Sequence, residues 1–358
     1  MKGYFLNRIL LVLFPAIIFS FCSCSMPTLD DISEMSSVEM IEYTAKGVKK
    51  AVVTVGIIQN GQMSYQVYGE NGREISQKEH VYEIGSITKT FTTSLLSKAI
   101  SENRVSFDNS ISVFLNLPSK YYYPSIKRII THTSGYKSSY YEDYVSTNFL
   151  NNGNSFYGIT GKTLFNRIGT INLENRDYPF EYSNFNMAVV GLILESIYNE
   201  DYTPLMNSYI KNDLGLNHTK ISDGSGDLSN YWLWDNGNPY IAAGAIVSTI
   251  TDMMLYAQIQ MDEIPSYLNL AHSVLAQVNA TTSDYAKFGI RIDAVGAGWM
   301  IDTVNNIIWH NGGTGNYNTY LCFNKTRNIA VVVLSNMAPG FRLNATVIGS
   351  KLFRELEG

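Results

Sequence analysis

Strand-like patterns lie at the two ends of this 358-residue chain, and helical patterns lie between them. Residues 51–58 form an apolar, β-branched run, and the following Asn60-Gly61 predicts a hairpin turn. Further strand patterns occur near the C-terminus, at 297–303, 306–310, 316–324 and 328–335. The simplest fold that uses both ends is one antiparallel sheet flanked by helices, an α/β (α+β) fold with the middle of the chain inserted as a mostly helical part.

The domain organisation follows from this layout. We expect one domain over 38–358, with a sheet part at 38–103 and 285–358 and a helical part at 104–284. Helical periodicity predicts helices at 38–48, 185–198, 202–213, 249–261, 264–277 and 340–356. Residues 137–180 are rich in Tyr, Asn, Ser and Gly with little periodicity, so we expect an irregular insertion there. A cleft between the two parts is the expected place for an active site.

The N-terminus has the pattern of an export signal. Lys2 and Arg8 precede a short apolar run at 9–21, which is too short to span a membrane as a helix. Small residues and two cysteines follow, as in a bacterial lipoprotein signal. We expect a signal peptide at 1–23, a lipid on Cys24 rather than Cys22, and a polar tether at 24–37. An ordinary cleaved signal is the alternative.

Composition narrows the chemistry. The formal net charge is −5 and no basic cluster occurs, which excludes the usual nucleic-acid binding pattern. No Gly-x-Ser-x-Gly, His-Glu-x-x-His, Cys-x-x-Cys or Gly-x-x-x-x-Gly-Lys motif occurs, so we expect no metal and no cofactor. Of the three cysteines, only Cys322 would remain free after lipidation, and it lies in an apolar run that predicts a buried core residue.

The stretch at 84–99 places a serine and a lysine where they can react. Gly85 ends an extended run, and apolar residues then recur at helical spacing. Ser86 and Lys89 are three positions apart, so they lie one turn apart on the same face. A neutral amine at that distance can take the proton of a serine hydroxyl, which is otherwise a poor nucleophile. The spacing alone is weak, because a capping serine and an exposed lysine would give the same pattern.

Two further motifs complete a set. Tyr182-Ser183-Asn184 forms Tyr-x-Asn just before a helical pattern, and His310-Asn311-Gly312-Gly313 lies on an expected strand. With Ser-x-x-Lys, in this order, they resemble the serine β-lactamase and penicillin-binding-protein superfamily, and within it the class C β-lactamase, DD-peptidase and esterase group. The similarity covers about residues 50–350. His132, in Thr-His-Thr-Ser-Gly, is expected to be a turn element of that family rather than a substrate contact.

The resemblance implies a role for each catalytic residue. Ser86 would attack a carbonyl and become acylated. Lys89 and Tyr182 would share the proton that Ser86 gives up, and which of the two is the base stays open, because groups this close titrate together. Tyr182 would return a proton to the leaving group.

The resemblance also implies substrate-binding residues. Asn184 would donate to the acyl-amide oxygen of the substrate and brace the lysine. His310 would face the cleft, and Gly312 would let the substrate approach the strand closely. The backbone N–H groups of Ser86 and Gly313 would form the oxyanion hole.

The function expected from this resemblance is that of a bacterial envelope serine hydrolase acting through an acyl-enzyme. A D-Ala-D-Ala carboxypeptidase-like or related peptidase comes first, and an esterase or a weak β-lactamase follows. Histidine at 310, where many lactam-hydrolysing relatives carry lysine, favours this order. A non-catalytic penicillin-recognising sensor or scaffold is the alternative of another class. The expected partners are a small-molecule or peptide substrate from peptidoglycan and, through the lipid, a membrane.

Overall fold

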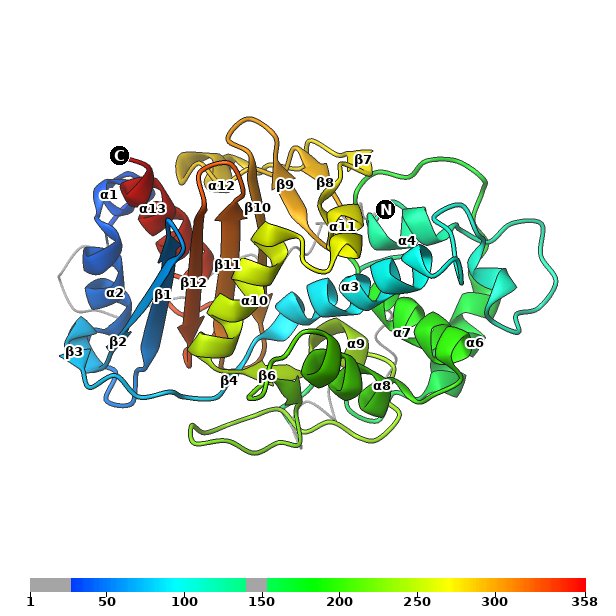
Figure 1. The fold of residues 1–358 in the computed structure, drawn as a ribbon, viewed down its shortest axis with the longest axis horizontal. Helices are drawn as coiled ribbons and strands as arrows, with labels where there is room; N and C mark the ends of the chain where they lie inside the picture. The colour runs from blue at the N-terminus through cyan, green and yellow to red at the C-terminus, as the bar shows by residue number, and fades with distance from the viewer. Residues whose placement is uncertain (1–26, 140–152) are drawn as a thin grey trace, which may run out of the picture.

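The computed structural model describes residues 27–139 and 153–358 and shows a sheet next to a group of helices (Figure 1). The large sheet consists of β1 (Val53–Gln59), β2 (Gln62–Tyr68), β3 (Glu74–Ile75), β7 (Ala276–Gln277), β8 (Ala294–Val295), β9 (Met300–Asp302), β10 (Ile307–Gly313), β11 (Asn318–Asn324) and β12 (Ile329–Ser335). A small sheet consists of β4 (Tyr82–Glu83), β5 (Lys220–Ile221) and β6 (Ile246–Ser248).

The helices are α1 (Leu29–Glu34), α2 (Ser37–Ala45), α3 (Thr88–Ser101), α4 (Ile126–Ile130), α6 (Gly161–Thr170), α7 (Asn184–Tyr198), α8 (Tyr202–Ser208), α9 (Ile241–Gly244), α10 (Ile250–Asp262), α11 (Asn269–His272), α12 (Ser283–Lys287) and α13 (Ala345–Glu357). A 3₁₀ turn, η2 (Gly85–Ile87), leads directly into α3.

The two ends of the chain meet in the large sheet, which confirms the predicted fold. Its order is β3-β2-β1-β12-β11-β10-β9-β8-β7. The antiparallel pair β1 and β12, with Val55 opposite Val333, joins the N-terminal hairpin to the C-terminal strands. Because β10 is held in the middle of this sheet, its end is a fixed platform.

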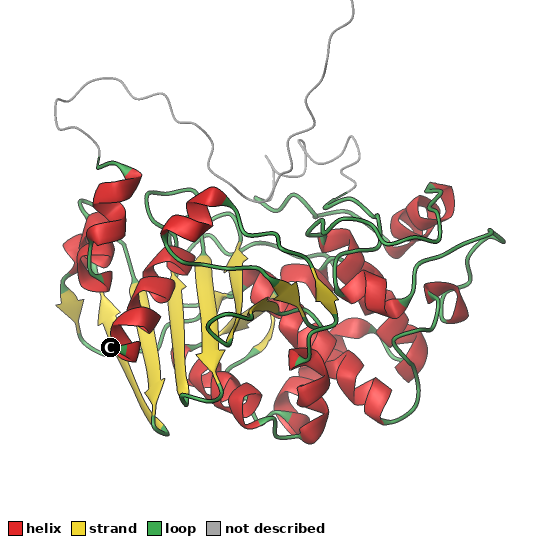
Figure 2. Cartoon of the chain, turned by 90° about the horizontal axis from the view of Figure 1, so that it is seen from above, coloured by secondary structure: helices red, strands yellow, loops and turns green. Residues whose placement is uncertain are grey.

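Both faces of the sheet are buried, which explains why β12 is apolar throughout. Ala330, Val332 and Leu334 belong to the core shared with α3 and α10. Val331 and Val333, which point the other way, belong to the core shared with α2 and α13. Figure 2 shows these helices on opposite sides of the strands. The buried Cys322 is a free thiol in the second core, as the sequence predicts.

Three boundaries differ from the prediction. The expected tether at 24–37 contains α1, which a Thr28–Asp31 capping box starts and whose Ile32 is buried. The expected helix at 264–277 is instead the short α11 followed by strand β7. In addition, α10 packs on β1, β11 and β12, so it belongs with the sheet although it lies inside the range predicted for the helical part. Local periodicity cannot tell which layer a helix joins.

Two predictions concern residues that the structure does not describe. The signal peptide at 1–23 and the lipid on Cys24 fall within residues 1–26. Of the insertion at 137–180, residues 140–152 also lie outside it, and the remainder contains α6, capped by Thr160. Across 27–139 and 153–358, no helix has the length and apolar character needed to cross a membrane.

Candidate active site

The turn η2 and the end of β10 touch at two glycines. Gly85 has φ +51°, and a Cβ there would lie 2.5 Å from the backbone nitrogen of Gly313. A Cβ on Gly312 would lie 1.9 Å from the Ile84 carbonyl oxygen. Only glycine permits this approach, so the start of the Ser86 turn lies directly against the His-x-Gly segment.

Ser86 and Lys89 are brought together as their spacing predicts. The Lys89 Nζ lies 2.8 Å from the Ser86 Oγ and 2.7 Å from the Ala243 carbonyl oxygen, which comes from α9. The Lys89 side chain is fully buried, while Ser86 stays partly exposed. Burial lowers the pKa of Lys89 well below its ordinary value of 10.5.

The helix that carries Lys89 runs through the interior with small hydroxyl side chains. The hydroxyls of Thr92, Thr93, Ser94 and Ser97 each donate to the carbonyl four residues earlier in α3. This pattern gives each buried hydroxyl an acceptor within the helix, and Thr92 and Thr93 also bond to the carbonyls of Ala242 and Ala297 outside it. Such narrow side chains let α7 and α9 pack closely on α3 and exclude water from the Lys89 amine.

Tyr182 lies over the lysine, held by the loop that follows α4. The Lys89 Nζ is 5.0 Å from the centre of the Tyr182 ring. The backbone N–H of Ser183 donates to His132 Nδ1 at 3.1 Å, and the Ser183 hydroxyl donates to the Lys137 carbonyl at 2.8 Å. Burial raises the pKa of the Tyr182 phenol, and the nearby Ser86 hydroxyl offsets part of this effect, although no hydrogen bond joins the two hydroxyls.

His132 is a neighbour of Tyr182 that the sequence reasoning assigned to a turn. It does adopt a turn conformation, with φ +58°. Its ring centre also lies 4.8 Å from that of Tyr182. Burial, and then the repulsion that a proton on Lys89 or His310 would exert, hold the pKa of His132 well below its ordinary value, so the ring is neutral. Because Nδ1 accepts the Ser183 N–H, the proton is on Nε2, a buried donor without a partner among the described residues.

His310 flanks the other side of Tyr182 in the opposite tautomer. Its ring centre is 5.9 Å from that of Tyr182. Nδ1 lies 2.6 Å from the Asn311 carbonyl, which can only accept, so the proton is on Nδ1 and Nε2 is an acceptor. Burial, and then the charge of Lys89, lower the pKa of His310 to about 3. The sequence does not reveal which nitrogen of His310 faces the site.

The end of β10 offers a free backbone edge. β9 pairs only with Ile307 to Trp309, whereas β11 pairs with β10 as far as Gly313. The Thr314 N–H donates to the Tyr317 carbonyl across the hairpin, and antiparallel pairs alternate, so the Gly313 N–H points away from β11. Beside it lies Ser86, at the start of η2, where backbone N–H groups have no partner within the helix. These are the two donors predicted for the oxyanion hole.

The predicted residues therefore gather at one place, with one difference. Ser86, Lys89, Tyr182 and His310 meet between η2, α3, α7 and β10. Asn184 is the first residue of α7, and its N–H donates to Ser138, but its side chain makes no hydrogen bond to Lys89. The Ala243 carbonyl braces the lysine instead. A backbone carbonyl has no signature in the sequence, so this partner could not be predicted.

Glu83 is a second residue that the motifs did not single out. It lies three positions before Ser86 and is 2% exposed. Its carboxyl group accepts from the Thr314 hydroxyl at 2.5 Å and from the Trp232 N–H at 2.6 Å. Burial raises the pKa of Glu83 to about 7, against the effect of both hydrogen bonds. Glu83 thus ties the nucleophile turn to the residue after Gly313.

In the described part of the chain, no three His, Cys, Asp or Glu side chains are grouped so that they could hold a metal ion. The site residues are a hydroxyl, an amine, a phenol and two neutral imidazoles. This set can transfer an acyl group and protons with no further component.

Comparison with known proteins identifies the family. The model of the beta-lactamase family matches residues 41–349, and the chain belongs to that family. Protein flp of Staphylococcus aureus (strain N315) is 22% identical over 303 residues, which cover 76% of this chain and 57% of flp. This chain thus spans little more than half the length of that relative. A beta-lactamase of Pseudomonas fluorescens is 25% identical over 332 residues, covering 80% of this chain and 88% of the relative.

Solved structures share the fold. A penicillin-binding protein homologue from Pyrococcus abyssi, described as octameric, has a TM-score of 0.68 at 20% identity and covers 90% of this chain and 76% of its own. A beta-lactamase/D-alanine carboxypeptidase from Yersinia pestis has a TM-score of 0.68 at 17% identity, covering 89% and 95%. A D-stereospecific amidohydrolase from Streptomyces sp. has a TM-score of 0.65 at 18% identity, covering 84% and 93%. The predicted superfamily and fold are thereby confirmed.

Proposed function

We propose that this chain is a serine hydrolase that works through an acyl-enzyme on Ser86. The observation that carries the proposal is the 2.8 Å contact between Ser86 Oγ and the buried Lys89 Nζ. Membership of the beta-lactamase family supports it, because the three motifs of that group occur in order and lie together. Ser86 is partly exposed, so a substrate can reach it.

The electrostatics favour Lys89 as the base. Burial lowers the pKa of Lys89 and raises the pKa of Tyr182, so the neutral amine and the neutral phenol are the favoured pair. The amine then accepts the Ser86 proton while Oγ forms a bond to the substrate carbonyl carbon. The carbonyl oxygen becomes an oxyanion between the N–H groups of Ser86 and Gly313.

Collapse of this intermediate breaks the bond to the leaving group. The Tyr182 phenol supplies the proton that the leaving nitrogen or oxygen needs, and the proton on Lys89 replaces it. Water then attacks the ester of Ser86 by the same route in reverse and releases the acid. Each step uses only groups that lie around the Ser86 Oγ.

The proposed substrate is a peptide that ends in D-amino acids, as in a D-Ala-D-Ala carboxypeptidase. The free edge of β10 at Asn311–Gly313 suits an extended peptide, which can add to it as a strand. Structural neighbours include proteins described as beta-lactamase/D-alanine carboxypeptidase and as D-stereospecific amidohydrolase. The neutral His310 offers no fixed positive charge for a lactam carboxylate. Ester hydrolysis and weak β-lactam hydrolysis come behind this peptidase activity.

A hydrolysis panel tests the proposal. The wild type would be assayed with a D-Ala-D-Ala peptide, a short-chain p-nitrophenyl ester and nitrocefin, alongside a fluorophosphonate label and intact mass. Ser86→Ala should lose turnover and label, whereas Ser101→Ala, at the exposed end of α3, should keep both. A wild type that binds penicillin but turns over none of the three substrates would instead support the sensor or scaffold alternative. An acyl adduct in Ser86→Ala would refute the assigned nucleophile.

We further propose that the protein works in the bacterial envelope, anchored by a lipid on Cys24. The support is the N-terminal sequence alone, with Lys2 and Arg8 before a short apolar run and cysteines. A fatty-acid analogue should label the wild type and not Cys24→Ser. An unlabelled mature N-terminus at another residue would show an ordinary signal peptide.

A further inference from the structure

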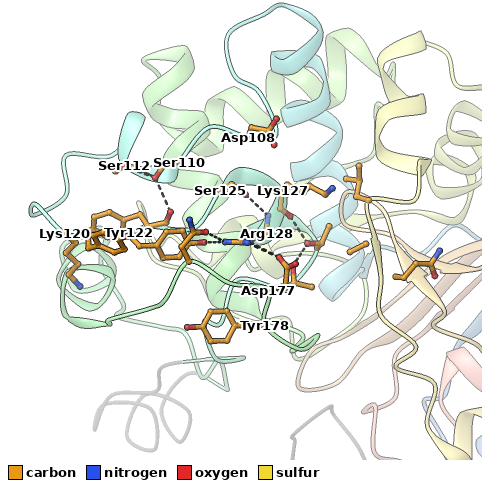
Figure 3. Close-up of a pocket in the computed structure, with 18 residues that line it drawn as sticks. Asp108, Ser110, Ser112, Lys120, Tyr122, Ser125, Lys127, Arg128, Asp177 and Tyr178 are labelled. Carbon is orange, nitrogen blue, oxygen red and sulfur yellow. Dashed lines mark hydrogen bonds and ion pairs between the residues drawn. The ribbon is translucent and has the colours of Figure 1, made fainter.

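A polar hollow of about 870 Å³ lies beside α4, away from the Ser86 hydroxyl. Figure 3 shows Arg128 near its centre, with serines on one side and Tyr178 on the other. The remaining wall is the edge strand β7, which pairs only with β8. The lining side chains are mostly hydroxyls and amides, among them those of Thr131, Thr133, Tyr121, Tyr122, Asn175 and Gln277.

One residue, His132, connects the wall of the hollow with the catalytic residues. Thr131 and Thr133 line it, and their hydroxyls lie 2.8 Å apart. His132, between them, has its ring against Tyr182. A molecule bound in the hollow therefore lies on the other side of a single loop from the reacting groups, where a remote part of the same substrate could lie.

The floor of the hollow is held in place before any ligand binds. The Arg128 Nη1 donates to the Tyr122 hydroxyl at 2.6 Å and to the Asn175 Oδ1 at 2.8 Å, and Nη2 pairs with Asp177 at 3.0 Å. The Arg128 guanidinium is thus already paired with the Asp177 carboxylate. Lys120 likewise donates to the Ile171 carbonyl at 2.7 Å. Two of the three cations of the hollow are therefore already engaged.

Other groups at the hollow have no partner within the described residues. The Tyr121 side chain is 100% exposed, and neither its hydroxyl nor the Gln277 amide nor the Lys127 ammonium makes a hydrogen bond or ion pair there. An exposed aromatic ring beside free donors and acceptors has one apolar face and a polar surround. That combination matches a sugar, whose ring has apolar C–H faces and a rim of hydroxyls.

We propose that this hollow binds a neutral oligosaccharide, the glycan part of a polymer whose peptide reaches Ser86. A small apolar ligand does not fit, because such ligands need an enclosed apolar pocket and this one is open and polar. A strongly anionic ligand does not fit either, because Asp108 and Asp177 also line the wall and Lys127 is the one cation there without a partner among the described residues. The inference rests on the proposed function and adds a glycan to the peptide substrate.

The test is calorimetric titration of the full chain with the hexamer of β-1,4-linked N-acetylglucosamine. Wild type should bind it saturably, and Tyr121→Ala/Lys127→Ala should bind at least about tenfold more weakly. The control, Val304→Ala/Lys50→Ala, removes another exposed apolar side chain and another exposed lysine elsewhere and should bind like wild type. Both double variants should keep the kcat/KM of wild type for a small p-nitrophenyl ester, which is too short to reach the hollow.

The outcomes separate this inference from the proposed hydrolase activity. Binding of a neutral sugar should not change between low and high salt, whereas a charged peptide would bind more weakly at high salt. No saturable sugar binding, or equal loss in both double variants, would overturn the inference. So would a hollow that binds the acetylated Lys-D-Ala-D-Ala peptide and not the sugar. Specific sugar binding by a chain that hydrolyses nothing would support the glycan site and refute the hydrolase.

Discussion

Replacing Glu83 by glutamine should change how stability depends on pH. In the folded protein the Glu83 carboxyl is buried between the Thr314 hydroxyl and the Trp232 N–H. Glutamine has the same shape. Its oxygen can accept from Trp232, and its NH₂ can donate to the Thr314 oxygen. The Glu83→Gln variant therefore removes the titration of this group while keeping both contacts.

The magnitude follows from the pKa of Glu83. Burial raises the pKa of Glu83 from an ordinary 4.5 to about 7. One pKa unit corresponds to about 1.36 kcal/mol, so keeping Glu83 ionised costs the folded state about 3 kcal/mol. Between pH 4.5 and pH 7 the folded state holds a proton on Glu83 that the unfolded chain has lost, so this group destabilises the fold progressively as pH rises. Above pH 7 the full cost applies, and below pH 4.5 it vanishes.

Urea unfolding at pH 5, 6, 7 and 8 measures this effect. The free energy of unfolding of Glu83→Gln minus that of wild type should rise by about 2–3 kcal/mol from pH 5 to pH 8. Taking the difference cancels the opposite trend from buried His132, His310 and Lys89, which the two proteins share. Glu70→Gln, at an exposed site, serves as the control and should give a flat difference. A flat or falling difference for Glu83→Gln would refute the assignment of a buried, protonated carboxyl.

Three further predictions concern catalysis. Tyr182→Phe and Lys89→Ala should each cost several kcal/mol in kcat/KM, and the double variant little more than either, because the two share one proton; additive losses would contradict this. His310→Lys should raise the nitrocefin acylation rate about tenfold, since a cation replaces a neutral acceptor; efficient nitrocefin hydrolysis by wild type would show that His310 is no handicap. His132→Ala should lower kcat about ten- to a hundredfold at unchanged KM, because it leaves the Ser183 N–H without an acceptor. His132→Asn, which can still accept that hydrogen bond, should restore part of the rate. An equal loss of rate in both variants would indicate a merely structural role.

The sequence by itself determined the sheet and the reacting residues. Apolar and β-branched runs predicted β1, β11 and β12, because this signal is local and both ends of the chain carry it. The spacing of Ser86 and Lys89 placed them one turn apart on the same face of a helix, and the two further motifs singled this pair out from a capping serine and an exposed lysine. Tyr182 and His310 lie far apart along the chain, and their place came from the resemblance of three ordered motifs rather than from any local pattern.

Tertiary structure alone decided the surroundings that set the chemistry. The Ala243 carbonyl braces Lys89 because α9 happens to end there, and a backbone oxygen leaves no trace in the sequence. Periodicity likewise gave no sign that α10 and β7 join the sheet rather than the helical part. The proton positions on His132 and His310 depend on which nitrogen meets the Ser183 N–H or the Asn311 carbonyl. The lowered pKa of Lys89 and the raised pKa of Glu83 come from burial, which is a property of the packed chain, because water is excluded only after distant segments have met.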